Sequence, residues 1–228
     1  MKINIFGDSI FKGVQLDSGM RYAVNDGIGF NEIAARAGMT VRNLSKFGCT
    51  ITKAWNYVQK MFSAVDADIV FMNFGGNDSD FNWAAISENP LDFHGPNTEF
   101  YDFTSTYNDM VDFFLKQRRL PVVSTLVPVQ TGMYVDHLCG TMNLDRENIR
   151  KWIDREGARF ENSQAVYSDA VKGVAAGMNI PLIDVRAAFN DCGNVSALMC
   201  PDGIHPNSKG QKVIHECFDA FMSDFLAF

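Results

Sequence analysis

Asp202 and His205, three residues apart, could form a hydrogen-bonded acid–base pair. A carboxylate that accepts a hydrogen bond from one ring nitrogen fixes the imidazole tautomer and leaves the other nitrogen free as a base. Pro206 suits the first position of a following helix, because proline lacks the N–H that such a position leaves unpaired. A D-x-x-H pattern is short, however, and taken alone it is explained better by a turn aspartate and a surface histidine.

Ser9 could be the nucleophile that such a base activates. It stands in Gly7-Asp8-Ser9, directly after the apolar run of residues 3–6. A serine hydroxyl attacks well only when an adjacent base removes its proton. The ordinary alternative is a helix N-cap, a position that serine favours. We expect Gly7 to permit a tight turn and Asp8 to hold it through hydrogen bonds to neighbouring backbone.

Three groups could stabilise the oxyanion that forms when a serine attacks a carbonyl carbon. They are the backbone N–H of Ser9, the backbone N–H of Gly48 and the side-chain amide of Asn77. Gly48 could equally be a turn glycine, and Asn77 a turn asparagine beside Gly75-Gly76. Whether these groups meet depends on the elements that carry them.

Five short runs rich in β-branched or aromatic residues predict strands over residues 3–6, 40–44, 68–74, 121–127 and 180–185. Segments with helical spacing separate them, including one over 145–177 with a break expected near Gly157 and a last one over 207–225. Strands that alternate with helices predict the α/β class. We expect a parallel sheet covered on both faces, which is a three-layer α/β/α sandwich.

The candidate residues follow the predicted strands. Ser9 follows the first, Gly48 the second and Asn77 the third, while Asp202 and His205 precede the last helix. In open parallel sheets the ligand lies outside the carboxyl ends of the strands. Three candidate groups after successive strands and a fourth before the last helix are hard to explain by chance. We therefore expect these groups to meet at one edge of the sheet.

Four blocks in this order resemble the SGNH-hydrolase superfamily, also called the GDSL esterases and lipases. The blocks are Gly7-Asp8-Ser9 with Gly13, the stretch NLSKFGCT at 43–50, Gly75-Gly76-Asn77-Asp78, and Asp202-Gly203-Ile204-His205. The second block has Ser45 where the family often has glycine. No G-x-S-x-G sequence occurs, which argues against the ordinary α/β-hydrolase fold.

The resemblance implies a flavodoxin-like fold with a five-stranded parallel sheet. It also implies site roles: Ser9 as the nucleophile, His205 as the general base and Asp202 as its orienting carboxylate. Gly48 and Asn77 would complete the oxyanion hole with the N–H of Ser9. No metal or organic cofactor is required by this chemistry.

The function implied is a serine esterase that forms an acyl-enzyme on Ser9. We favour a short acyl group, such as acetyl, on a soluble carbohydrate-like substrate, because small acyl groups on carbohydrates are a common target of the family. A lysophospholipase or thioesterase with a longer acyl preference is the alternative within the enzyme class. A non-catalytic module that binds a nucleotide or phosphate is a third reading, although residues 7–13 match neither G-x-G-x-x-G nor a P-loop.

Two long segments, 79–104 and 130–145, show no clear periodicity and are expected to be loops that wall the site. Phe81, Trp83 and Tyr134 lie on them and are candidates for substrate binding. Anchoring of the loops on the core is an equally weighted explanation for these aromatic residues.

Composition sets the outer bounds. The chain has 228 residues, 46% hydrophobic and 21% charged, which predicts one globular domain over 1–228. A net charge of −7 disfavours a nucleic-acid partner, and no apolar run reaches membrane-spanning length. The N-terminus lacks signal-peptide features, so we expect a cytoplasmic protein that acts on a small-molecule ester. Five irregularly spaced cysteines without C-x-x-C predict neither a disulfide framework nor a zinc site.

Overall fold

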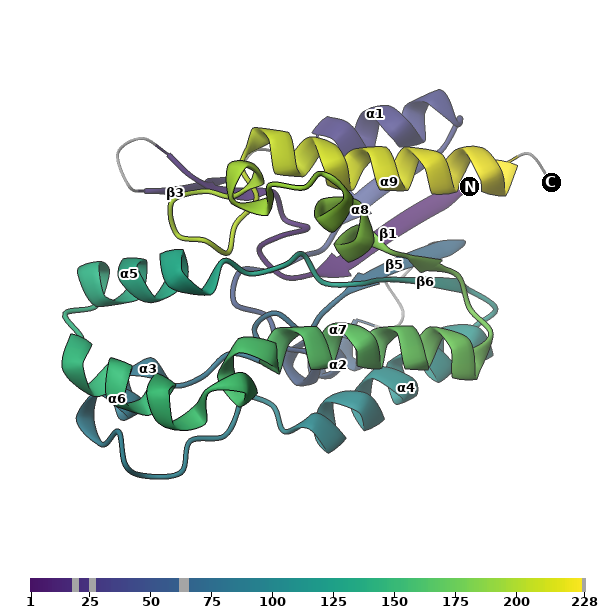
Figure 1. Cartoon of the computed structure of the whole chain (residues 1–228). Coiled ribbons are helices and arrows are strands. Elements are labelled where there is room, and N and C mark those ends of the chain that lie inside the picture. Colours follow the sequence, from purple (N-terminus) through teal and green to yellow (C-terminus); the bar gives the residue numbers. More distant parts are fainter. Residues whose placement is uncertain (18–20, 25–27, 62–65, 227–228) are drawn as a thin grey trace.

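The computed structural model describes residues 1–17, 21–24, 28–61 and 66–226. Its central sheet is parallel and follows the order β4-β1-β5-β6-β7 (Figure 1). The strands are β1 (Lys2–Gly7), β4 (Thr40–Asn43), β5 (Ile69–Asn73), β6 (Leu120–Ser124) and β7 (Leu182–Ile183). This is the flavodoxin-like order, in which the chain changes direction across the sheet beside its first strand. The predicted fold class is confirmed.

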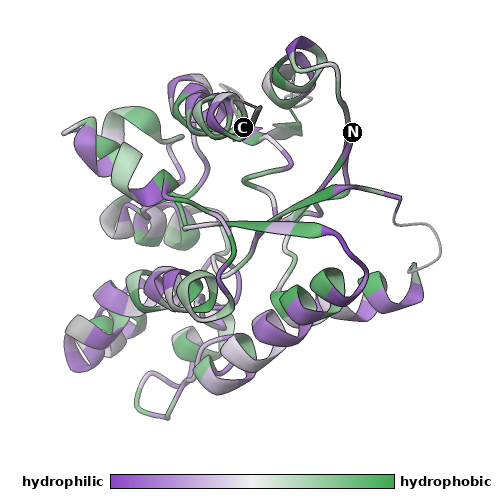
Figure 2. Ribbon diagram, turned by 90° about the vertical axis from the view of Figure 1, so that its right-hand side faces the viewer, coloured by the Kyte–Doolittle hydropathy of each residue, from purple (hydrophilic) through white to green (hydrophobic). Residues whose placement is uncertain are grey.

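Helices cover both faces of this sheet. One layer contains α1 (Ile28–Arg36), α8 (Val185–Asp191) and α9 (Ser208–Leu226), and the other contains α2 (Ile51–Lys60), α4 (Phe100–Lys116) and α7 (Ala158–Met178). Figure 2 shows the strands between the two layers, with hydrophobic parts of the helices turned toward them. The three-layer sandwich follows from this arrangement.

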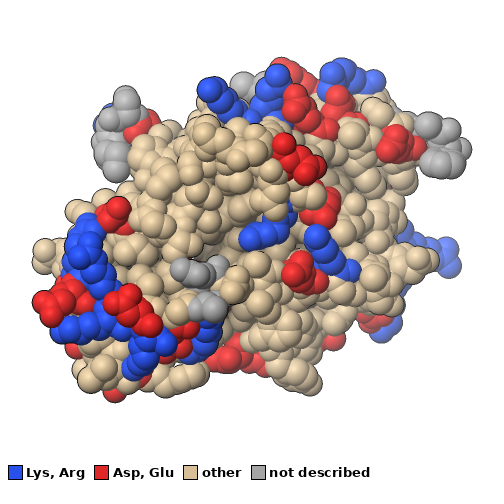
Figure 3. All heavy atoms as spheres, in the orientation of Figure 1, with Lys and Arg blue, Asp and Glu red and all other residues tan. Residues whose placement is uncertain are grey.

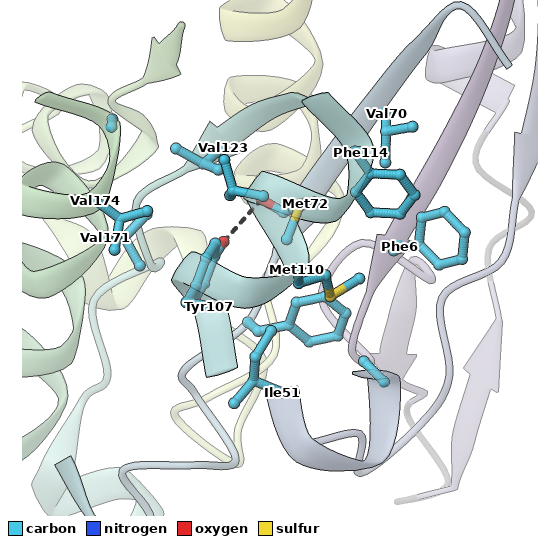
Figure 4. Packing of buried hydrophobic residues seen from close by; sticks show 14 of the residues in the cluster. Phe6, Ile51, Val70, Met72, Tyr107, Met110, Phe114, Val123, Val171 and Val174 are labelled. Carbon is cyan, nitrogen blue, oxygen red and sulfur yellow. Dashed lines mark hydrogen bonds between the residues drawn. The ribbon is translucent and has the colours of Figure 1, made fainter. Parts of the chain in front are cut away.

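Alternation along each strand supplies both halves of the core, because successive side chains point to opposite faces. In β5, Ile69 and Phe71 belong to the cluster under α1 and α9, whereas Val70 and Met72 belong to the cluster under α4 and α7. Tyr107 of α4 lies over the second face, and its hydroxyl donates to the carbonyl oxygen of Met72 at 3.4 Å (Figure 4). Strands buried on both faces read as continuous apolar runs, which is how the sequence revealed them.

The break near Gly157 and the end of the last strand were both predicted from the sequence. The segment predicted as a helix over 145–177 is divided into α6 (Arg146–Glu156) and α7 by Gly157, whose φ of 49° lies in the region that favours glycine. The last strand is shorter than the predicted run of 180–185. It ends at Ile183 because Asp184 caps α8, accepting a hydrogen bond from the backbone N–H of Ala187 at 3.1 Å.

The segments predicted as irregular loops contain helices. Helix α5 (Thr131–Thr141) occupies most of 130–145, and α3 (Trp83–Glu88) lies within 79–104, so the loop prediction is wrong for these residues. Their helical pattern is weak because they pack on a separate small core, with Trp152 of α6 at its centre, rather than on the sheet. A hairpin of β2 (Val14–Leu16) and β3 (Tyr22–Val24) was also not predicted.

In Figure 1, α3, α5 and α6 extend beyond the carboxyl ends of the strands on one side of the sheet. The β2–β3 hairpin extends on the other side, so the strand ends lie between these two additions. Within the described ranges, no helix has both the length and the apolar character needed to cross a membrane.

Candidate active site

Ser9 lies in a tight turn at the carboxyl end of β1. The backbone N–H of Ile10 donates to the Asp8 carboxylate at 2.8 Å, and the N–H of Val14 donates to the Ser9 carbonyl at 2.9 Å. The chain then enters β2, so Ser9 caps no helix and its ordinary explanation as an N-cap is wrong. Space favours glycine at position 7, because a Cβ there would lie 3.0 Å from the Cβ of Phe11 and 3.2 Å from the carbonyl oxygen of Asn73, which are tight contacts.

Ser9, His205 and Asp202 form one chain of hydrogen bonds. The Nε2 atom of His205 lies 2.9 Å from the Oγ of Ser9, and its Nδ1 lies 2.7 Å from the Oδ2 of Asp202. All three residues are buried, with exposed fractions of 2% for His205, 0% for Asp202 and 6% for Ser9. The fold therefore brings together a hydroxyl, a base and a carboxylate that are separated by up to 196 positions in the sequence.

The loop that carries Asp202 and His205 is closely braced. The backbone N–H of Cys200 donates to the carbonyl of His205 at 2.7 Å, and Gly203 adopts a φ of 71°. A Cβ on Gly203 would lie 2.6 Å from the carbonyl oxygen of Gln130, so only glycine fits. This bracing fixes the direction of the imidazole toward Ser9.

The Asp202 carboxylate is held in its charged form. Burial alone would raise its pKa, but hydrogen bonds from the imidazole and from the backbone N–H groups of Ile204 and His205 outweigh burial and lower the pKa. An ionised Asp202 makes Nδ1 of His205 the protonated nitrogen. The free lone pair of Nε2 then faces the Ser9 hydroxyl, as a general base requires.

Gly48 and Asn77 lie at the neighbouring strand ends, as the sequence predicted for an oxyanion hole. Gly48 adopts a φ of 64°, and a Cβ at that position would meet no atom within 4 Å, so its backbone borders open space. The side-chain amide of Asn77 donates to the Asp8 carboxylate at 3.1 Å and to the Cys49 carbonyl at 3.4 Å. Asp8 thus holds the Asn77 amide as well as its own turn, a role that sequence reasoning missed.

Two further carboxylates are buried beneath the site. Asp78 accepts the backbone N–H of Ile51 at 3.0 Å and so ties the start of α2 to the end of β5. Burial raises the pKa of Asp8 and that of Asp78 to about 6 each, against which their hydrogen bonds act only in part. Both groups therefore change charge in the mildly acidic range.

These raised pKa values predict how stability depends on pH. Between about pH 4 and 6 the folded protein keeps protons on Asp8 and Asp78 that the unfolded chain has already lost. The free energy of unfolding should therefore fall as the pH rises through this window. In the variant Asp78→Asn the free energy of unfolding should fall less steeply with pH. The slope should be smaller than that of the unmodified protein by on the order of 1 kcal/mol per pH unit. Urea unfolding at several pH values measures both slopes.

The matched control is Asp109→Asn, which changes an exposed carboxylate on α4. It should reproduce the pH slope of the unmodified protein. An unchanged slope in Asp78→Asn would contradict the assignment of a raised pKa to this buried group.

A cavity of about 120 Å³ opens beside Ser9 and His205 and runs past the ends of β5 and β6. Phe81 and Tyr134, both predicted as substrate-binding residues, line it. Trp83, the third, does not: it is 4% exposed and packs edge-on against Trp152 at 5.7 Å, which corrects the prediction for that residue.

Two aromatic rings that the sequence did not single out lie beside the imidazole of His205. The ring of Phe47 is stacked with that of His205 at 6.0 Å, and the ring of Tyr22 meets it edge-on at 5.2 Å. Phe47 is 58% exposed and Tyr22 44% exposed. Phe47, an apolar residue in the polar loop beside Gly48, could have been noticed in the sequence, whereas nothing in the sequence places Tyr22 here.

Comparison with known proteins identifies the family of this chain. A family model described as the GDSL-like lipase/acylhydrolase family matches residues 5–213. The chain belongs to this family. As a member, it is a serine ester hydrolase, and the reading as a non-catalytic binding module is set aside. A sequence search of curated proteins finds no match.

Solved structures of the same architecture support the fold of this GDSL-like acylhydrolase. The lipase/acylhydrolase from Enterococcus faecalis is 17% identical, with a TM-score of 0.65 over 98% of this chain and 95% of that chain. A catalytic mutant of an acetylxylan esterase from Geobacillus stearothermophilus is 18% identical, with a TM-score of 0.66 over 97% and 93%. An α/β hydrolase enzyme from the metagenome of Lake Arreo, Spain, is 21% identical, with a TM-score of 0.67 over 97% and 94%.

Proposed function

We propose that this GDSL-like acylhydrolase removes a short acyl group, such as acetyl, from a carbohydrate-like alcohol through an acyl-enzyme on Ser9. The observation that carries the proposal is the hydrogen-bond chain from Ser9 through His205 to Asp202. The serine, the imidazole and the carboxylate are in contact in the order that a nucleophile, a base and an orienting carboxylate need.

His205 takes the proton of Ser9 as Oγ attacks the ester carbonyl. The oxyanion that forms lies against the backbone N–H groups of Ser9 and Gly48 and the amide of Asn77. The longer of the two Asn77 hydrogen bonds, 3.4 Å to the Cys49 carbonyl, is the one that the oxyanion replaces. His205 then protonates the departing alcohol, and water attacks the acyl-enzyme by the same route.

The cavity beside Ser9 suits a short acyl group. Apolar side chains such as Leu126, Val127 and Phe81 line it near the reacting centre. Arg186 and Gln164 also line it, and the Arg186 guanidinium donates to the Gln164 side-chain oxygen at 2.6 Å. A long acyl chain would have to bury its end against this polar pair, which is costly. This supports the short-chain esterase over the lysophospholipase or thioesterase alternative.

The alcohol side of the ester has a different setting. The exposed rings of Tyr22 and Phe47 flank His205, which is the residue that protonates the leaving alcohol. Exposed aromatic rings offer apolar faces on which a sugar ring can pack while its hydroxyl groups remain in water. An acetylxylan esterase of similar fold also acts on such an ester, which supports this substrate class.

A series of p-nitrophenyl esters tests the acyl preference. We expect kcat/KM to fall from acetate through butyrate to octanoate. The variant Arg186→Leu makes the polar end of the cavity apolar. The kcat/KM values of the longer esters should therefore rise relative to that of acetate. The gain should be roughly fourfold for each methylene group that the enlarged cavity accepts, from about 0.8 kcal/mol per buried CH₂.

Arg150→Leu changes an exposed arginine on α6 and is the matched control, for which the ester ratios should stay unchanged. Each ratio divides the kcat/KM of one ester by that of another for the same variant. A loss of active protein lowers both values equally and does not change the ratio. A higher kcat/KM for octanoate than for acetate in the unmodified enzyme would favour the long-chain alternative. Release of acetate from an acetylated xylooligosaccharide tests the carbohydrate part directly.

A further inference from the structure

A groove of about 400 Å³ lies beside the loop that carries Gly48, which we call the oxyanion loop. It shares no lining residue with the cavity beside Ser9, which we call the acyl cavity. It is lined by the loop between β4 and α2 and by one face of α2. Its lining includes Lys46, Phe47, Gly48, Lys53, Tyr57 and Lys60. We call this surface the lysine groove. Its first residues are part of the reacting centre, because Gly48 borders the oxyanion position and Phe47 is stacked with His205.

The lysines of the groove are placed by helical spacing. Lys53 and Lys60 are seven residues apart on α2, two turns of helix, and therefore share one face. Lys46 lies over the ring of Tyr57, with its Nζ 3.8 Å from the ring centroid, and the Nζ of Lys53 approaches the Gly48 carbonyl at 3.4 Å. All three lysines are exposed, so they direct positive charge toward solvent along the groove.

This positive charge lacks the compensation found elsewhere on the protein. Five lysines elsewhere pair with carboxylates, as Lys151 does with Glu147 on α6, whereas Lys12 and Lys209 pair with none of the described carboxylates. Figure 3 shows the two signs of charge mixed over α6. Within the described ranges no ion pair involves Lys46, Lys53 or Lys60. Residues 33–65 contain five basic residues and no Asp or Glu, although the whole chain has a net charge of −7. Of the nearby carboxylates, Asp8 and Asp78 are buried below the loop.

The two sides of the ester can be assigned to the two hollows. In the proposed function the acyl group occupies the cavity past β5 and β6. The alcohol then leaves past His205 and Phe47 toward the β4 side, where the lysine groove begins. An open groove can hold the larger alcohol part. A cationic groove attracts negative charge, and its field raises the local concentration of an anionic substrate.

We propose that the lysine groove binds a negatively charged group on the alcohol part of the ester, so that acyl esters of anionic carbohydrates are the preferred substrates. The anionic group is a carboxylate, sulfate or phosphate on the sugar, since each forms charge-assisted hydrogen bonds with lysine. This inference rests on the proposed function, which takes the alcohol to be a carbohydrate.

Paired substrates that differ in one charge test the proposal. The first pair is an O-acetylated methyl glucuronoside and the matching methyl glucoside. The second pair, 4-acetoxybenzoate and its methyl ester, carries the same charge difference without a sugar. For each pair we take the ratio of kcat/KM for the anionic ester to kcat/KM for the neutral ester. This ratio is compared between the unmodified enzyme and the double variant Lys53→Gln/Lys60→Gln. The intrinsic reactivity of each ester is the same for both enzymes and cancels in the comparison.

We expect the double variant to lower this ratio roughly three- to tenfold at low salt, as loss of two exposed charge contacts predicts. The loss should arise mainly in KM, and added salt should lower the ratio of the unmodified enzyme. Since p-nitrophenyl acetate carries no negative charge, added salt should change its kcat/KM far less than that of the anionic esters. The control Lys116→Gln/Lys151→Gln removes the same charge from α4 and α6 and should leave the ratio as it was.

The outcomes separate the two proposals. If both sugar esters are hydrolysed but the double variant keeps the unmodified ratio, the lysine-groove proposal is overturned and the carbohydrate esterase stands. If neither sugar ester is hydrolysed while the aryl pair shows the lysine-dependent ratio, anion binding by the groove stands and the carbohydrate part of both proposals is overturned. Binding to vesicles of phosphatidylglycerol that requires Lys53 and Lys60, with no charge dependence in either substrate pair, would also overturn the proposal.

Discussion

Ser9→Ala is expected to lower kcat/KM for p-nitrophenyl acetate by at least about 10⁴-fold, in line with the loss of a serine nucleophile in other hydrolases. The Oγ atom that it removes lies 2.9 Å from Nε2 of His205 and is the atom that we propose forms the acyl-enzyme. Residual activity should come from binding and the oxyanion donors alone. Stopped assays at high enzyme concentration measure so large a loss.

The fold should survive this change. Ser9 lies in a turn held by Asp8 and Val14 through other atoms, so urea unfolding should show a loss of only about 1 kcal/mol, the value of one buried hydrogen bond. A fluorophosphonate should label the unmodified enzyme at Ser9 and leave the variant unlabelled, as mass spectrometry would show. Ser208→Ala, at an exposed serine on α9, should behave like the unmodified enzyme. Retention of more than a tenth of the activity by Ser9→Ala would assign the nucleophile elsewhere.

Asp202→Asn is expected to lower kcat by about 10⁴-fold through the histidine tautomer. Asparagine can keep the oxygen that accepts the backbone N–H of His205 at 3.0 Å, so the loop should keep its path. The amide that replaces Oδ2 donates toward Nδ1 of His205, which must then be unprotonated. The proton moves to Nε2 and faces the Ser9 hydroxyl, so the imidazole can no longer act as the base.

This explanation is tested by separating chemistry from binding. KM should change little, since Asp202 is buried and does not line the acyl cavity. A crystal structure of the variant should show the Ser9–His205 contact retained. Asp112→Asn, at an exposed carboxylate that pairs with Lys116, is the matched control and should leave kcat unchanged. A loss of less than tenfold in Asp202→Asn would mean that the carboxylate has a structural role only.

Much of the fold was predictable because its signals are local. Strands buried on both faces appear as short apolar runs, and the break at Gly157 appears as a glycine between two helical patterns. The helical character of α5 was not predictable in this way. Its residues pack on the small core around Trp152, so their pattern matches neither a sheet-facing helix nor an exposed one.

The sequence by itself determined the family of this protein and the edge of the sheet where its candidate catalytic residues meet. Ser9, Gly48, Asn77 and the Asp202–His205 pair follow strands or precede a helix, and parallel strands carry their carboxyl ends to one edge. Gly203 marks a tight turn of the backbone, and Gly7 a place where other atoms approach it closely. These inferences depend on residue type and chain order, which the sequence contains.

Only the tertiary structure decided which side chains surround the reacting atoms. It buried Trp83 in a core, placed Tyr22 and Phe47 beside His205, and put Arg186 in the wall of the cavity that opens beside Ser9. It also aligned the lysines of α2 with the oxyanion loop. The physical reason is that such contacts join segments far apart in the chain, and their distances follow from how helices and loops pack rather than from any local pattern.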